Sequence, residues 1–209
     1  MSNAQRTPVV PLEAGAGPEN PPCPACGEPL FGWLSTQPGL DGPVSRCESC
    51  GLGVVGEPGE PELALGELER LDGEGNPRIA NRTSFAAALG NAGWAGLEPG
   101  ARYLFTVESA RRLVARRDLV VKSRRWAPLA GLAATWQTLL NSVTFGHNVA
   151  LAALGRGQAT RARRRWQRRI DGLASIVLAI PALVVALPVE LAGGLLGRGA
   201  VITLRFELL

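Results

Sequence analysis

The stretch from Arg161 to Gly197 constrains this chain more than any other, because it joins a dense arginine run to a long apolar run. Six arginines lie within its first nine residues, and Leu173 to Val189 carries no charged side chain. Arginines are attracted to lipid phosphates and an apolar helix enters hydrocarbon, so an anionic membrane surface accommodates both halves. We call residues 161–197 the apolar arm.

The length of the apolar arm bears on how it meets a membrane. A helix needs about 20 apolar residues to cross a bilayer, and Pro181 and Pro188 interrupt the run. Each proline favours a kink or break, because it lacks a backbone donor and clashes with the preceding turn. If the β-like segment 199–208 pairs with an earlier strand, both ends of the arm lie on one side. The sequence therefore favours a dip into one leaflet. A single span, with the arginines on the cytoplasmic side, and a pair of buried core helices are the alternatives.

The side chains expected to contact the membrane fall into two groups. The headgroup region suits arginines and tryptophan, here Arg163, Arg164, Arg165, Trp166, Arg168 and Arg169. The hydrocarbon region suits the aliphatic residues Ile176, Leu178, Ile180, Leu183, Val184 and Leu187. This pattern predicts attachment to the cytoplasmic face of the cell membrane, as a peripheral, monotopic or single-pass protein.

Charge is distributed unevenly along the chain, although the net charge is only +4. Residues 1–75 carry twelve acidic residues and three arginines, whereas residues 76–209 carry six acidic and nineteen basic residues. A basic region is also typical of nucleic-acid-binding proteins. The apolar run beside the arginines favours a membrane over nucleic acid as the partner.

Four cysteines form two CxxC pairs, Cys23 with Cys26 and Cys47 with Cys50, each followed directly by glycine. Such a loop aims two thiolates at one ion, and glycine lets the backbone turn tightly. Two loops make a closed tetrahedral site, which is typical of structural zinc. The N-terminus lacks the basic start and apolar core of a signal peptide. A metal site is therefore favoured over two disulfides or four free thiols.

Composition divides the chain into four segments. Residues 1–20, rich in proline, glycine and alanine, are typical of a disordered tail. Residues 21–56 form the predicted zinc ribbon, which is too small to fold without its metal. Residues 57–100 are acidic and broken by proline and glycine, which favours a linker, with a short helix over 62–71 as the alternative. Residues 101–209 form the last segment.

The last segment contains clear local signals. Thr106 is a good N-cap for an amphipathic helix. Beyond it, Leu119–Arg124 and Ala200–Leu208 are predicted to pair as an antiparallel hairpin, with helices between them. A lone hairpin is only marginally stable in water, so we expect contacts with the arm, the membrane or a partner to stabilise it. The fold class predicted is α+β, with a zinc ribbon, a mostly helical region, a C-terminal hairpin and a membrane-associated helical arm.

Several short motifs follow one another in a recognisable order. A PxxxYxFTxxSxRRL-like segment comes first, then a WQxxLNS-like stretch and a GRGxxxxL closing strand. Their residues are Pro99, Tyr103, Phe105, Thr106, Ser109, Arg111, Arg112, Leu113, Trp136, Gln137, Leu140, Asn141, Ser142, His147, Asn148, Gly197, Arg198, Gly199 and Leu204. This order resembles the C-terminal part of class I S-adenosylmethionine-dependent methyltransferases. It is similar to a bacterial branch that often carries an N-terminal four-cysteine ribbon.

The resemblance implies a methyl transfer from S-adenosylmethionine to a membrane-linked lipid or glycan. The acidic-GxGxG loop that cradles the cofactor in that family has no counterpart here, and Ala101 and Leu104 stand where the family has histidines. No catalytic or cofactor-binding residue is carried over, and His147, the only histidine, is expected to be structural. We therefore expect a pseudoenzyme, the remnant of a methyltransferase, acting as an accessory subunit beside an intact methyltransferase or another protein. An active methyltransferase and a zinc-ribbon nucleic-acid binder are the alternatives.

Overall fold

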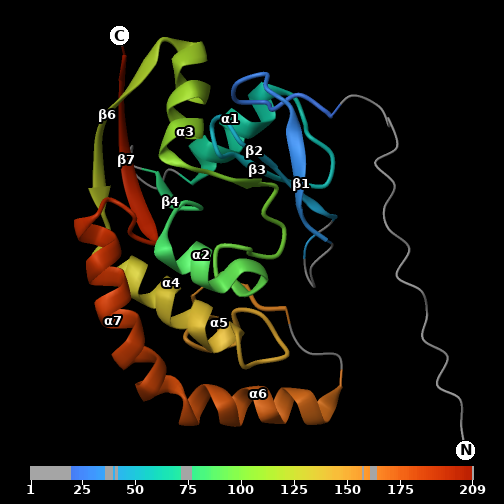
Figure 1. Ribbon diagram of the computed structural model, residues 1–209, viewed down its shortest axis with the longest axis vertical. Coiled ribbons are helices and arrows are strands. Elements are labelled where there is room, and N and C mark those ends of the chain that lie inside the picture. The colour runs from blue at the N-terminus through green and yellow to red at the C-terminus, as the bar shows by residue number, and fades with distance from the viewer. Residues whose placement is uncertain are drawn as a thin grey trace, which may run out of the picture.

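The computed structural model describes residues 20–35, 40, 42–71, 77–156, 158–160 and 164–208. Within this part of the chain the fold is α+β, as predicted, with seven α-helices and two antiparallel sheets (Figure 1). All but the last residue of the predicted N-terminal tail lies outside the described residues.

The first sheet has four antiparallel strands in the order β1–β2–β3–β5. They are β1 (Leu30–Leu34), β2 (Val44–Cys47), β3 (Gly53–Val55) and β5 (Tyr103–Leu104). The first three strands lie in the predicted ribbon, whereas β5 comes from much later in the chain. Gly53 pairs with Leu104, and Val54 pairs with Tyr103. The ribbon is therefore completed by a distant segment.

The second sheet has three strands in the order β4–β7–β6. They are β4 (Arg78–Ala80), β7 (Val201–Leu208) and β6 (Leu119–Trp126). The predicted antiparallel pairing of Leu119–Arg124 with Ala200–Leu208 is confirmed. Strand β4 adds to the other edge of β7, with Ile79 opposite Ile202. The hairpin thus gains a third strand, and the buried Ile79 and Ile202 pack it onto the core.

Three helices and two 3₁₀ turns precede β6: α1 (Pro61–Arg70), α2 (Phe85–Gly90), η1 (Asn91–Gly93), α3 (Val107–Val114) and η2 (Ala115–Arg117). Helix α3 begins at the predicted N-cap. Thr106 Oγ1 accepts from the Ser109 backbone nitrogen at 3.0 Å, and Ser109 Oγ accepts from that of Thr106 at 2.9 Å. Helix α1 lies in the segment that composition assigned to a linker, and its Leu65 and Leu68 are buried.

The chain between β6 and β7 is a helical excursion, as predicted: α4 (Pro128–Asn141), α5 (Val149–Ala153), α6 (Arg165–Val177) and α7 (Ala179–Leu195). In Figure 1, α6 runs across the bottom of the view beneath α5, and α7 rises beside α4 towards β7.

A bend of 60° separates α6 from α7. Helix α6 ends at Val177, four residues before Pro181, whose ring would clash with the Val177 carbonyl in a continuous helix. The predicted break at Pro181 is confirmed. Pro188 behaves differently, because α7 continues through it and packs along α4.

One buried cluster joins both sheets to α1 and α3. Its members are Cys23, Ala25, Leu30, Cys47, Cys50, Leu52, Val54, Ala64, Leu65, Leu68, Ile79, Tyr103, Phe105, Ala110, Leu113, Val114, Ile202 and Leu204. A second cluster lies around α2, where Trp94 is 1% exposed. Because three cysteines belong to the first cluster, the cysteine turns share a core with the sheet that carries the helical excursion.

Candidate metal centre and apolar arm

The sulfur atoms of the four cysteines converge on one point. All four Sγ atoms lie within 4.8 Å of one another. The Sγ atoms of Cys23 and Cys50 are 3.5 Å apart, and those of Cys26 and Cys47 are 3.4 Å apart. A tetrahedron with metal–sulfur bonds of about 2.3 Å has edges of about 3.8 Å. The four cysteines are therefore positioned to bind one metal ion.

Backbone geometry places each cysteine pair on a tight turn. Gly27 and Gly51 have φ angles of +81° and +76°, a region open to glycine. The Gly27 backbone nitrogen donates to the Cys23 carbonyl at 2.8 Å, and that of Gly51 donates to the Cys47 carbonyl at 3.0 Å. The two turns are equivalent, which is what the repeated CxxCG pattern predicts.

The pKa values of the clustered thiols shift in different directions. The hydrogen bond from Cys50 is the main cause that lowers the pKa of Cys23 to about 5, with backbone hydrogen bonds adding to it. The pKa of Cys50 is raised, mainly because Cys50 holds the proton that it shares with Cys23. Burial raises the pKa of Cys26. A cation among the sulfur atoms favours four thiolates, which is the form of cysteine that binds metal.

The arm presents most of its predicted membrane-contacting side chains to solvent. Ile176, Ile180 and Val184 are 75%, 74% and 67% exposed. The others that are exposed are Arg164, Arg165, Trp166, Arg168, Arg169, Leu183 and Leu187. Leu178 is half-buried at the bend, and Arg163 lies outside the described residues. In the described residues no single helix is long and apolar enough to cross a membrane, whereas α6 and α7 together meet that requirement by length and composition.

The inner side of α6 is fixed to the rest of the molecule by polar contacts. Asp171, 1% exposed, accepts from the backbone nitrogens of Phe145 at 2.7 Å and Gly146 at 3.0 Å. At the start of α7, the Ala179 carbonyl accepts from Trp136 Nε1 of α4 at 2.8 Å. The bend itself is therefore tied to α4.

Glu190 fixes the inner side of α7 and is 3% exposed. It accepts hydrogen bonds from Trp126 Nε1 and Thr135 Oγ1, both at 2.7 Å, and from the Ala200 backbone nitrogen at 3.0 Å. These donors come from β6, from α4 and from the residue directly before β7. One carboxylate thus joins three elements beside α7.

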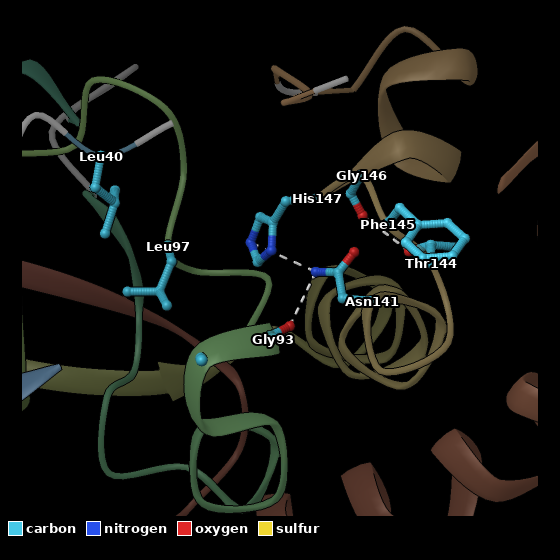
Figure 2. Close-up of a pocket in the computed structure, with 9 residues that line it drawn as sticks. Leu40, Gly93, Leu97, Asn141, Thr144, Phe145, Gly146 and His147 are labelled. Atoms are coloured by element: carbon cyan, nitrogen blue, oxygen red, sulfur yellow. Dashed lines mark hydrogen bonds between the residues drawn. The ribbon is translucent and has the colours of Figure 1, made fainter. Parts of the chain in front are cut away.

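His147 lines a cavity of about 230 Å³ together with Asn141, and Figure 2 shows Asn141 between His147 and Gly93. Asn141 Nδ2 donates to the Gly93 carbonyl at 2.9 Å and lies 3.4 Å from His147 Nε2. Burial lowers the pKa of His147, and a hydrogen bond to the backbone of Trp94 offsets part of that decrease. These contacts suit a neutral, structural imidazole.

Sequence reasoning missed the contacts of Asp171, Glu190 and Arg82; the Arg82 Nε donates to the Gly51 carbonyl of the second cysteine turn at 2.6 Å. Glu190 had a usable signal, since it is a lone carboxylate in an apolar stretch, where burying an unpaired charge is costly. Asp171 had a weaker signal, as the lone acid between the arginine run and the apolar run. Arg82 had no signal of its own, because its contacts to the second cysteine turn depend on the tertiary fold.

Comparison with protein-family models, with curated proteins and with solved structures gives no match for this chain. Its function must therefore be inferred from the chemistry of the cysteine cluster and of the arm.

Proposed function

We propose that this chain is a zinc-ribbon accessory protein that docks on an anionic membrane surface through the apolar arm. The observation that carries the proposal is the exposed aliphatic face of α6 and α7, which adjoins exposed arginines at the start of α6. The anionic surface suits the cytoplasmic leaflet, where acidic lipids attract basic segments.

Zinc is the metal that fits the cysteine cluster best. Four thiolates in a tetrahedral arrangement are a typical ligand set for structural zinc, and such a site leaves no open position for water or substrate. Cys23, Cys26, Cys47 and Cys50 would hold the ion. Because three of the four are almost fully buried within the main core, its role would be to stabilise the fold.

The exposed face of the arm has the make-up of a membrane-docking surface. Soluble monomers rarely expose large contiguous apolar patches, and such patches mark interaction sites. Trp166 is 48% exposed among the arginines and stacks edge-on against Phe145, with ring centroids 5.5 Å apart. Aromatic rings beside cationic groups suit the headgroup layer. The aliphatic residues around the bend would then reach the acyl chains.

The contacts of the arm favour docking over spanning. Asp171 and Glu190 anchor the two ends of the uncharged run to the same folded body. Trp136 anchors the bend between them. Because α7 packs along α4, crossing the bilayer would require these buried hydrogen bonds to break without replacement.

Vesicle flotation of the full chain tests the proposal. We expect binding to phosphatidylcholine vesicles that contain phosphatidylglycerol, and weaker binding without it. Replacing Arg165, Arg168 and Arg169 with glutamine removes three charges at the surface. At about 1 kcal/mol each, this lowers the partition coefficient roughly a hundredfold on anionic vesicles. The matched control replaces the exposed Arg116, Arg125 and Arg205, outside the arm, with glutamine; it should bind almost as the unmodified chain does.

A second pair of variants tests the apolar face. Replacing Ile176, Ile180 and Val184 with serine should weaken binding to both kinds of vesicle, whereas Leu63→Ser on α1, where the leucine is 51% exposed, should not. Equal binding by all variants, or binding to DNA that exceeds binding to anionic vesicles, would refute the proposal. Protection of one terminal tag from external protease would show a span instead of docking.

A further inference from the structure

We propose that Arg82 positions the second cysteine turn, Cys47–Gly51, and supplies positive charge beside the metal centre. The inference rests on the proposed zinc centre and goes beyond it, because Arg82 lies outside the ribbon. Arg82 follows β4 of the second sheet. Arg82 would couple zinc binding to the packing of the second sheet against the ribbon.

Two contacts fix the Arg82 side chain beside the cysteines. Its Nε donates to the Gly51 carbonyl at 2.6 Å. Its guanidinium lies 4.9 Å from the ring centroid of Trp33, close enough for a cation–π contact. The side chain is half-buried, so the guanidinium is held between the ribbon strand β1 and the turn that carries Cys47 and Cys50.

The charge of the site favours a nearby cation. Four thiolates around one divalent ion carry a net charge of −2, and the surrounding groups tune a metal site of this kind. Burial and the nearby Arg46 lower the pKa of Arg82, whereas Cys50 and Cys47 act in the opposite direction. Among the described residues, no carboxylate lies within ion-pair distance of Arg82. Its charge is therefore available to the thiolates.

A neighbouring arginine differs on this point. Arg112 Nη1 donates to Ser49 Oγ of the same turn at 3.1 Å. Its Nε, however, is paired with Glu108 at 3.0 Å. Glu108 also pairs with Arg111 at 2.8 Å, so it balances the Arg112 charge only in part. The hydrogen bond to Glu108 is the main cause that raises the pKa of Arg112, and Cys26 and Cys50 raise it further. Arg112 therefore also contributes positive charge near the thiolates, whereas Arg82 is the arginine whose side chain donates to the Gly51 carbonyl of the turn.

The backbone around Arg82 connects the turn to the second sheet. The Asn81 nitrogen donates to the Ala200 carbonyl at 2.8 Å, and the Arg82 nitrogen donates to the Phe105 carbonyl at 3.3 Å. Thr106 Oγ1 donates to the Cys50 carbonyl at 2.7 Å. Ala200 directly precedes β7, onto which the helical excursion returns. A metal that orders the turn would thus also order the sheet that carries the arm.

The experiment measures zinc affinity of the full chain by competition with a chromogenic chelator. Loss of a group that supports metal ligands typically lowers affinity by 10–100-fold, and we expect that loss for Arg82→Gln. Arg82→Lys should recover part of it, since lysine keeps the charge without the planar fork. Arg205→Gln, an exposed arginine on β7, should bind zinc as the unmodified chain does.

The outcomes separate the inference from the proposed zinc site. Zinc affinity of Arg82→Gln equal to that of the unmodified chain would overturn the inference, and so would Arg82→Lys binding no better than Arg82→Gln. Cobalt absorption without four-thiolate bands in the unmodified chain would overturn the zinc centre itself, and the inference with it. If Arg82→Gln is unfolded without metal, the zinc concentration that restores half of the fold gives the same comparison.

Discussion

Replacement of Glu190 by alanine is the sharpest test of how the arm is held. The carboxylate is 3% exposed and is the shared acceptor for Trp126 Nε1, Thr135 Oγ1 and the Ala200 nitrogen. Alanine leaves these three donors without their partner in a space that the side chain filled. The same change also relieves the cost of burying a carboxylate.

These opposing effects set the expected magnitude. An unsatisfied buried donor costs about 1–3 kcal/mol, so three donors correspond to about 3–9 kcal/mol. Relief of carboxylate burial, together with a water molecule in the space left behind, offsets part of this cost. We therefore expect Glu190→Ala to lower the free energy of unfolding by about 3 kcal/mol. Glu190→Gln keeps the shape and one acceptor, so its loss should be smaller.

Denaturant unfolding of the zinc-loaded chain measures the effect, followed by tryptophan fluorescence and circular dichroism. The control is Glu207→Ala, which removes an exposed ion pair with Lys122. Surface pairs contribute about 0–1 kcal/mol, so the control should stay within that range. A Glu190→Ala variant within about 1 kcal/mol of the unmodified chain would show that the hydrogen bonds of Glu190 do not hold the arm.

Two further predictions concern metal and pH. Chelation of zinc should abolish helical as well as strand signal in far-ultraviolet circular dichroism, because the cysteines share a core with Leu113 and Leu204; retained helical signal would contradict a shared core. Burial lowers the pKa of His147 in the folded state, so the unfolded chain binds a proton first. Stability should therefore fall as pH drops below about 6.5. His147→Gln should show a smaller fall over that range, and an identical pH profile would refute a titrating buried imidazole.

Local signals in the sequence predicted much of the architecture. The repeated CxxCG pattern predicted two equivalent turns, because close cysteine pairs and glycine fix a turn over a few residues. Thr106 predicted the start of α3, and Pro181 predicted the break between α6 and α7. The pairing of β6 with β7 followed from two β-like segments on either side of a helical stretch.

Other features depended on contacts between distant segments. Composition favoured a linker for residues 57–100, yet Leu65, Leu68 and Ile79 are buried in the core. Proline, glycine and acidic residues indicate the local backbone conformation. They do not show which apolar side chains pack against distant segments of the chain. The third strand, β4, was missed for the same reason, since three residues carry little periodicity.

The sequence by itself determined the four cysteines that are positioned to bind a metal ion and the apolar, arginine-flanked character of the arm, because both depend on residue type and close spacing. Only the tertiary structure decided how these two parts are held. Glu190 takes its donors from β6, from α4 and from Ala200 just before β7, and Arg82 reaches the cysteine turn from the segment after β4. Buried polar groups are hydrogen-bonded, and their partners here are distant in the sequence. These contacts therefore form only when folding has brought the segments together.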